Sequence, residues 1–196
     1  MKSEQIAVTS KGLGISEALA LTEEIGKSAG LDEKSVLHLR LLAEEVSGML
    51  RGIAGDVEAM YWLEAEGRKF ELHLQSTVQM TAEMKEQFIS ASTEGKNAAA
   101  VGFMGKIKVM IAGSLLSAKE ALPYAMVNTA SAYSAGGVFT WSMDEYRMVL
   151  QSQENKEMAA DDAWDELEKS IVAKIADDVK VSVVGKNVEI IVFKTF

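Results

Sequence analysis

The carboxylate of Glu45 occupies a position suited to general-base chemistry. It lies within residues 31–53, where apolar residues recur at steps of 3, 4, 3 and 4: Leu39, Leu42, Val46, Met49 and Ile53. This spacing predicts a helix with one continuous apolar face. Glu45 follows Leu42 by three residues and precedes Met49 by four, so it lies at the edge of that face, whereas Glu44 is rotated about 100° toward solvent. A carboxylate on the inner side of a central helix is either catalytic or paired with a cation.

Other polar groups give weaker indications. Acidic residues gather at the predicted start of a helix: Asp161, Asp162, Asp165 and Glu166. The helix dipole favours acidic side chains there, so a solvated first turn explains them better than a metal site. The two histidines, His38 and His73, fall on different predicted elements and form no metal-binding motif. The chain has no cysteine, which excludes a thiol nucleophile and thiolate metal sites.

Size and charge narrow the functional class. The 196 residues suffice for one well-cored domain. The net charge is −9, from 29 acidic and 20 basic residues, and no basic cluster is present, so we expect no binding to nucleic acid. No apolar run reaches the ~18 residues of a transmembrane helix. The first residues, MKSEQIAVTSKG, lack the apolar centre of a signal peptide, so we expect a cytoplasmic protein without membrane contact.

The elements that position Glu45 follow from turn and capping signals. Residues 4–9 predict a strand, and residues 16–28 predict a helix with Ser16 as its N-cap. Gly30 supplies the left-handed position that ends this helix. Asp32 then caps the long helix of residues 31–53.

Two hairpins are predicted to follow that helix. Residues 58–66 and 69–75 form the first, across a turn at Gly67, and His73 lies on the face opposite Phe70 as a half-exposed residue. Residues 179–184 and 187–193 form the second hairpin, across Gly185.

Helical patterns occupy much of the sequence between the two hairpins. Helices are predicted at 82–90, 101–116, 142–153 and 161–176, the last with Trp164, Leu167, Ile171 and Ile175 on its apolar side. Residues 124–140 are consistent with either a strand pair or a loop. The fold class is therefore α/β: a two-layer sandwich in which helices cover one face of a mixed, mainly antiparallel sheet.

This order of elements resembles the GHKL (histidine-kinase-like) ATPase fold, and most closely the anti-sigma-factor serine kinases. Gly30-Leu31-Asp32-Glu33 is similar to the junction that precedes the family's glutamate helix, and Leu41 to Glu45 is similar to the approach to that glutamate. The resemblance covers residues 4–76, 102–111 and the closing hairpin. It implies a single domain over residues 1–196, with an insertion at about 117–160.

The resemblance implies specific roles for a few residues. Glu45 matches the glutamate that activates the attacking group, but Met49 occupies the position of the magnesium-binding asparagine. Thioether sulfur is a poor ligand for a hard cation, so we expect no metal site there. Ser76 falls near the adenine-binding aspartate, and Gly102 and Gly105 have the outline of the glycine-rich phosphate loop.

Two functions follow from this comparison. The first is a GHKL-like domain with a degenerate ATP site and no cofactor. It would be a non-catalytic binding or regulatory module of bacterial-type signalling that acts through a protein partner, such as a regulator or sigma-like factor, or as a homodimer. The alternative is an active serine protein kinase with divergent motifs, which would use ATP and Mg²⁺ with Glu45 as its base. An enzyme unrelated to ATP has only the acidic cluster near Asp161 in its favour.

Overall fold

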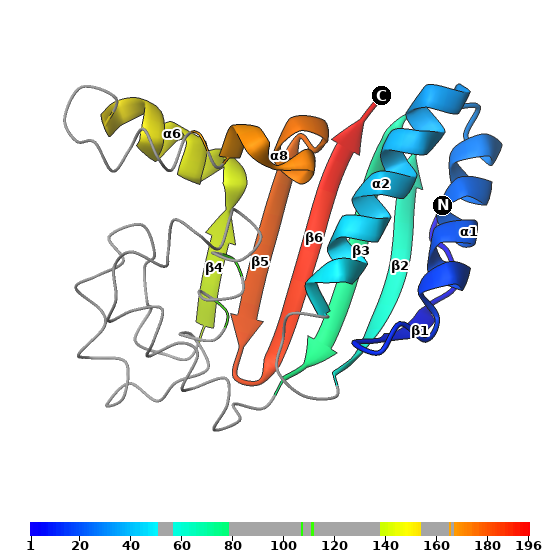
Figure 1. The fold of residues 1–196 in the computed structure, drawn as a ribbon, viewed down its shortest axis with the longest axis horizontal. Coiled ribbons are helices and arrows are strands. Elements are labelled where there is room, and N and C mark those ends of the chain that lie inside the picture. Colours follow the sequence, from blue (N-terminus) through cyan, green and yellow to red (C-terminus); the bar gives the residue numbers. More distant parts are fainter. Residues whose placement is uncertain (51–56, 79–106, 108–110, 112–137, 154–164, 166) are drawn as a thin grey trace.

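Six strands form a single sheet in the computed structural model of this protein (Figure 1). The structure describes residues 1–50, 57–78, 107, 111, 138–153, 165 and 167–196. The elements in chain order are β1 (Ile6–Thr9), α1 (Ile15–Ser28), α2 (Glu33–Leu50), β2 (Glu58–Glu66), β3 (Lys69–Thr77), β4 (Val138–Ser142), α6 (Met143–Gln153), α8 (Ile171–Ile175), β5 (Asp178–Val184) and β6 (Asn187–Thr195).

The strand order in the sheet is β1-β2-β3-β6-β5-β4. Helices α1 and α2 lie together over one face, with α2 packed against β3 and β6 (Figure 1). The predicted α/β two-layer class is therefore confirmed. Every pairing between the described strands is antiparallel, so the parallel component expected of a mixed sheet is not seen among them.

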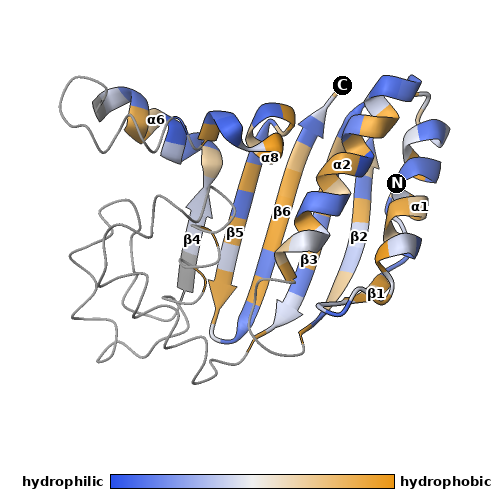
Figure 2. Ribbon diagram, in the orientation of Figure 1, coloured by the Kyte–Doolittle hydropathy of each residue, from blue (hydrophilic) through white to orange (hydrophobic). Residues whose placement is uncertain are grey.

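Alternation of side chains decides which face of the sheet the helices cover. Figure 2 shows this alternation as apolar and polar bands along β5 and β6. On β2 the residues toward the helices, Ala59, Tyr61 and Leu63, are all buried, and Leu39 and Leu42 of α2 are completely buried against that layer. Burying one leucine side chain contributes roughly 1.5–3 kcal/mol, so the apolar stripe of α2 fixes the helix on the sheet.

The helix ends agree with prediction at two positions and differ at one. Gly30 has φ +73°, and the Oδ1 of Asp32 accepts a hydrogen bond from the backbone N–H of Ser35 at 2.9 Å, as a helix cap does. Ser16 is not the cap of α1, because that helix already begins at Ile15, after Gly14. Gly14 has φ +74°, a conformation that a capping serine rarely adopts.

The helix predicted over residues 161–176 is interrupted. Ser170 is extended, and its hydroxyl accepts a hydrogen bond from the N–H of Ala173, so it caps a new helix, α8. The interruption changes which residues face the core: Val172 is buried and Ile171 is 45% exposed, contrary to the predicted apolar stripe. Leu167 is buried as predicted.

The C-terminal half adds an edge strand that the sequence left undecided. Strand β4 pairs with β5, and α6 follows it directly, with Asp178 accepting hydrogen bonds from Ser142 and from the N–H of Asp144. Both β4 and α6 fall within the expected insertion. The predicted helix of 82–90 lies outside the described residues. No helix in the described part is both long and apolar enough to cross a bilayer.

A buried hydrogen-bond pair joins the helical layer to the sheet. The hydroxyl of Thr22 on α1 donates to the carbonyl of Ala18 at 2.7 Å, so the hydroxyl of Tyr61 on β2 donates to Thr22, also at 2.7 Å. Burial raises the pKa of Tyr61, and the hydrogen bond with Thr22 opposes that rise only in part. The phenol is therefore a neutral structural donor.

Candidate functional site

The carboxylate predicted to do chemistry lies where the helical pattern placed it. Glu45 is partly buried on α2, between the buried Leu42 and Met49, and its neighbour Glu44 is exposed. Glu45 makes no hydrogen bond or ion pair with another described residue. Its carboxylate is thus held at the margin of the core without a described partner.

Met49 lies one turn further along α2 and is only 2% exposed. It belongs to the main apolar cluster, together with Val46 and Leu50 of the same helix. Its thioether supplies no oxygen ligand, and a hard cation at this position would have to be held by other groups.

Ser76 lies near the end of β3, on the face that α2 covers. Its hydroxyl donates a hydrogen bond to the carbonyl of Glu58 at 2.7 Å, which ties β3 to β2. The residue is buried, and its strand packs against α2 (Figure 1). The structure therefore brings Ser76, Glu45 and Met49 onto two elements that are in contact.

Gly102 and Gly105 lie outside the described residues, as do Asp161, Asp162 and Glu166 of the acidic cluster. Ile107 and Ile111, which follow the glycines, are helical and buried, as their spacing predicts. Asp165 is exposed and lies 3.8 Å from the Nζ of Lys169, in agreement with a solvated helix turn.

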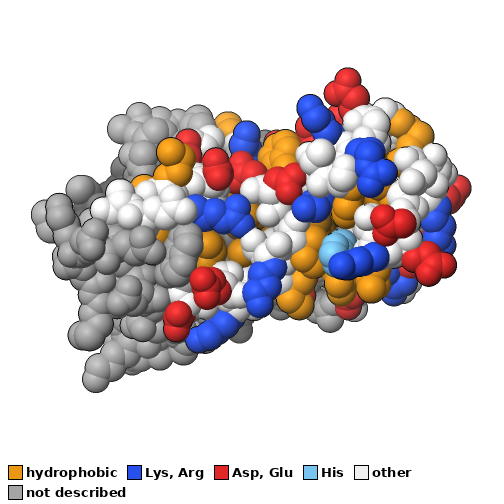
Figure 3. All heavy atoms as spheres, turned by 90° about the horizontal axis from the view of Figure 1, so that it is seen from above, with side chains coloured by type: hydrophobic (Ala, Val, Ile, Leu, Met, Phe, Trp, Pro, Cys, Tyr) orange, Lys and Arg blue, Asp and Glu red, His pale blue; other side chains and the backbone are white. Residues whose placement is uncertain are grey.

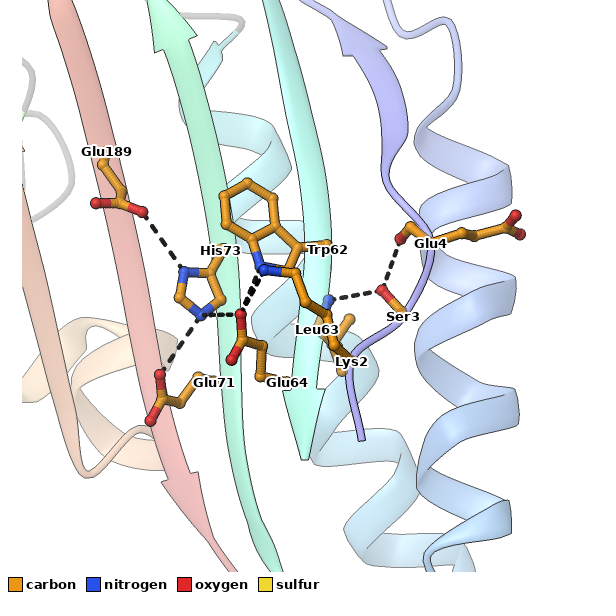
Figure 4. A network of polar contacts seen from close by, with 9 residues as sticks. All are labelled: Lys2, Ser3, Glu4, Trp62, Leu63, Glu64, Glu71, His73 and Glu189. Carbon is orange, nitrogen blue, oxygen red and sulfur yellow. Dashed lines mark hydrogen bonds and ion pairs between the residues drawn. The ribbon is translucent and has the colours of Figure 1, made fainter. Parts of the chain in front are cut away.

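A second polar group lies on the opposite face of the sheet, turned away from α1 and α2. His73 stands at its centre on β3, and its ring stacks on that of Trp62 with centroids 4.6 Å apart and planes 7° from parallel. Figure 4 shows three carboxylates pointing at this ring, from β2, β3 and β6. We call these residues the His73 cluster: Trp62, Glu64, Glu71, His73 and Glu189.

The distances in the His73 cluster define two sides of the ring. The Nε2 of His73 lies 3.4 Å from Glu71 and 4.0 Å from Glu64, while its Nδ1 lies 3.6 Å from Glu189. Neither nitrogen makes a hydrogen bond, although the residue is only 7% exposed. The prediction of a half-exposed strand histidine was therefore wrong, because the stacked indole and the three neighbouring side chains cover the ring.

Lys2 holds one member of the cluster from the N-terminal segment. Its Nζ lies 2.8 Å from the Oε1 of Glu64 and 5.0 Å from the centre of the Trp62 ring. This hydrogen bond lowers the pKa of Glu64. The indole N–H of Trp62, at 3.1 Å, and the charges of Lys2 and His73 lower it further. Glu64 therefore stays ionised below the ordinary titration range of a glutamate.

The charges at the end of the molecule seen in Figure 3 are mixed. Basic and acidic side chains are interspersed over its described surface, with apolar side chains between them. Within the described residues, no group of three or more His, Cys, Asp or Glu side chains is arranged to hold a metal ion.

Comparison with family models, with curated proteins and with solved structures gives no match to this chain.

Proposed function

We propose that this chain is a GHKL-like domain with a degenerate ATP site, and that it acts as a non-catalytic binding or regulatory module on a protein partner in the cytoplasm. The order strand, helix, helix, hairpin and closing hairpin supports the proposal. The burial of Met49 within the apolar cluster is the observation that carries it.

The chemistry of ATP binding explains why Met49 matters. Magnesium binds oxygen ligands in a near-ideal octahedron and bridges the phosphates to the protein. At 2% exposure, Met49 fills the core at the position from which such a ligand would reach out. Ser76 donates its proton to Glu58 and retains only a neutral acceptor for an adenine amino group. Met49 thus lacks the oxygen ligand, and Ser76 lacks the negative charge, that the family uses at these positions.

Calorimetric titration with a non-hydrolysable ATP analogue tests the proposal. We expect no magnesium-dependent binding at concentrations up to about 1 mM, where a dissociation constant corresponds to only ~4 kcal/mol of binding free energy. The titration is run with magnesium and again with a chelator. Tight binding that requires magnesium would contradict a degenerate site.

The alternative function, an active serine protein kinase, is favoured by one observation. Glu45 is partly exposed and has no described ionic partner, so its carboxylate is accessible to a proton on a substrate, as general-base catalysis needs. Under this alternative, Glu45→Gln abolishes phosphate transfer from ATP to protein, whereas Glu44→Gln on the exposed side of α2 does not. Radiolabelled transfer to candidate partners measures both variants. We expect no transfer even by the wild type, and transfer that depends on Glu45 but not on Glu44 would establish the kinase.

A further inference from the structure

The His73 cluster brings like charges together on the face of the sheet turned away from α1 and α2. The pairing of β2 with β3 places Glu64 directly opposite Glu71, and Glu189 reaches the same ring from β6 (Figure 4). Two carboxylates that face each other across neighbouring strands destabilise a sheet, whereas a pair of opposite charge stabilises it. The acidic pair therefore gives the sheet itself no advantage, but it offers a cation from another molecule two acceptors side by side.

The carboxylates of the cluster have more acceptor capacity than the neighbouring donors fill, because a carboxylate only accepts hydrogen bonds. The two donors that reach them, Lys2 and the indole N–H of Trp62, both donate to Glu64. Among the described residues, the side chains of Glu71 and Glu189 receive no hydrogen bond and contact no lysine or arginine. They are 45% and 35% exposed, so their oxygens are accessible to a donor from another molecule.

The ring of His73 is a further unsatisfied group at the same place. It is almost completely buried, and neither Nδ1 nor Nε2 makes a hydrogen bond. Most buried polar side-chain atoms in proteins have a hydrogen-bond partner. Both nitrogens point toward carboxylate oxygens, with Nε2 3.4 Å from Glu71 and Nδ1 3.6 Å from Glu189. The cluster thus contains a buried polar side chain, aimed at the carboxylates, whose hydrogen bonds are not made within the described chain.

Lys2 shows which kind of group the cluster accepts. Its Nζ lies 2.8 Å from the Oε1 of Glu64 and 5.0 Å from the centre of the Trp62 ring, within the range of a cation–π interaction. The ring of His73 covers the other face of the indole, since rings with centroids 4.6 Å apart leave no space for an ammonium group between them. Both side chains of the Lys2–Glu64 pair are exposed to solvent, and such ion pairs contribute little to stability. A competing cation can therefore replace Lys2.

We propose that the His73 cluster binds an arginine side chain of a protein partner, which takes the place of Lys2 over Trp62 and bridges Glu64 and Glu71. Arginine fits better than lysine, because its planar guanidinium stacks on an aromatic ring and donates hydrogen bonds to two carboxylates at once. The net charge of −9 favours the approach of a basic surface, and the carboxylates repel the phosphates of a nucleic acid or an anionic membrane. The site rests on the proposed function in requiring a protein partner, and it lies on the face of the sheet opposite α2.

Titration with a blocked tetra-arginine peptide tests the site, with a tetra-citrulline peptide as the uncharged control of the same shape. Nuclear magnetic resonance follows the indole N–H signal of Trp62 in the ¹⁵N-labelled protein. We expect the arginine peptide to shift this signal and the citrulline peptide to leave it unchanged. Glu71→Gln should weaken binding about fivefold. Glu44→Gln removes the same charge from the exposed side of α2 and should change the affinity by less than about twofold. Equal weakening by both variants, or no binding to the wild type at about 1 mM peptide, overturns the proposal.

Replacement of Lys2 gives a second measurement, which does not depend on the folding of Glu71→Gln. Lys2→Gln should tighten binding of the arginine peptide about threefold, because the peptide then has no competitor over Trp62. Lys34→Gln removes the same charge at the exposed start of α2 and should have a smaller effect. Equal effects of the two replacements would contradict the proposal. These titrations contain no nucleotide, so their failure removes this site alone, whereas magnesium-dependent ATP binding would remove the degenerate site alone.

Discussion

Replacing Gly14 with alanine should destabilise the protein by about 3 kcal/mol or more. Gly14 has φ +74°, a left-handed conformation in which an L side chain is strained. A Cβ built on Gly14 would lie 1.9 Å from the carbonyl oxygen of Ala7, far inside van der Waals contact. That oxygen belongs to β1, which pairs with β2, so relief of the clash requires the start of α1 to move away from the sheet.

Gly30→Ala is the matched control for this prediction. Gly30 has φ +73°, but a Cβ there would meet nothing within 4 Å. Gly30→Ala should therefore lower the free energy of unfolding only by the strain of the left-handed conformation, about 1–2 kcal/mol. Denaturant unfolding of both variants separates the cost of the left-handed backbone conformation from the cost of the steric clash with Ala7. Equal losses of unfolding free energy in the two variants would show that the backbone of β1 at Ala7 moves aside at little cost.

Met49→Asn, which installs the magnesium-binding side chain of the GHKL ATPases that the sequence resembles, should cost about 3 kcal/mol of unfolding free energy and confer no nucleotide binding. The asparagine would bury an amide where the surroundings are apolar, and it would leave a cavity where the longer thioether packs. Thermal unfolding measures the loss, and calorimetry with magnesium and an ATP analogue measures binding.

Met49→Leu controls for packing alone, because a volume-conserving apolar change in a core costs less than about 1.5 kcal/mol. If Met49→Asn were as stable as Met49→Leu, the amide would have found water or another partner. The position would then open onto a polar cavity, and the degenerate-site proposal would lose its main support.

Local patterns in the sequence predict most of the described elements. The hairpin around Gly67 and the stripe of α2 both depend on neighbours within a few residues, where turn chemistry and helical spacing are decisive. The interruption at Ser170 was missed because the apolar spacing of Leu167, Ile171 and Ile175 continues across it, although serine is a favoured helix cap. The antiparallel pairing of β4 with β5 depends on contacts between segments far apart in the sequence, which the periodicity of apolar residues does not encode.

The candidate sites differ in how much the sequence reveals. The position of Glu45 at the core margin and the burial of Met49 follow from the spacing of α2. The stacking of Trp62 on His73 follows from the hairpin register, in which these two residues are directly opposed. Glu189 reaches the same ring only because β6 pairs with β3, which no local signal predicts.

The pairing of β3 with β6 also bears on how the nascent chain acquires its structure. Leu72 pairs with Val192, so a stretch on the order of a hundred residues must be synthesised before the middle of the sheet closes. A partial sheet of β1, β2 and β3 formed before that point would have a β3 edge with unpaired backbone groups, because β6 is its partner in the finished sheet. Such an edge is a template for pairing with other chains. Translation speed and chaperone binding during that interval should therefore affect the yield of native protein.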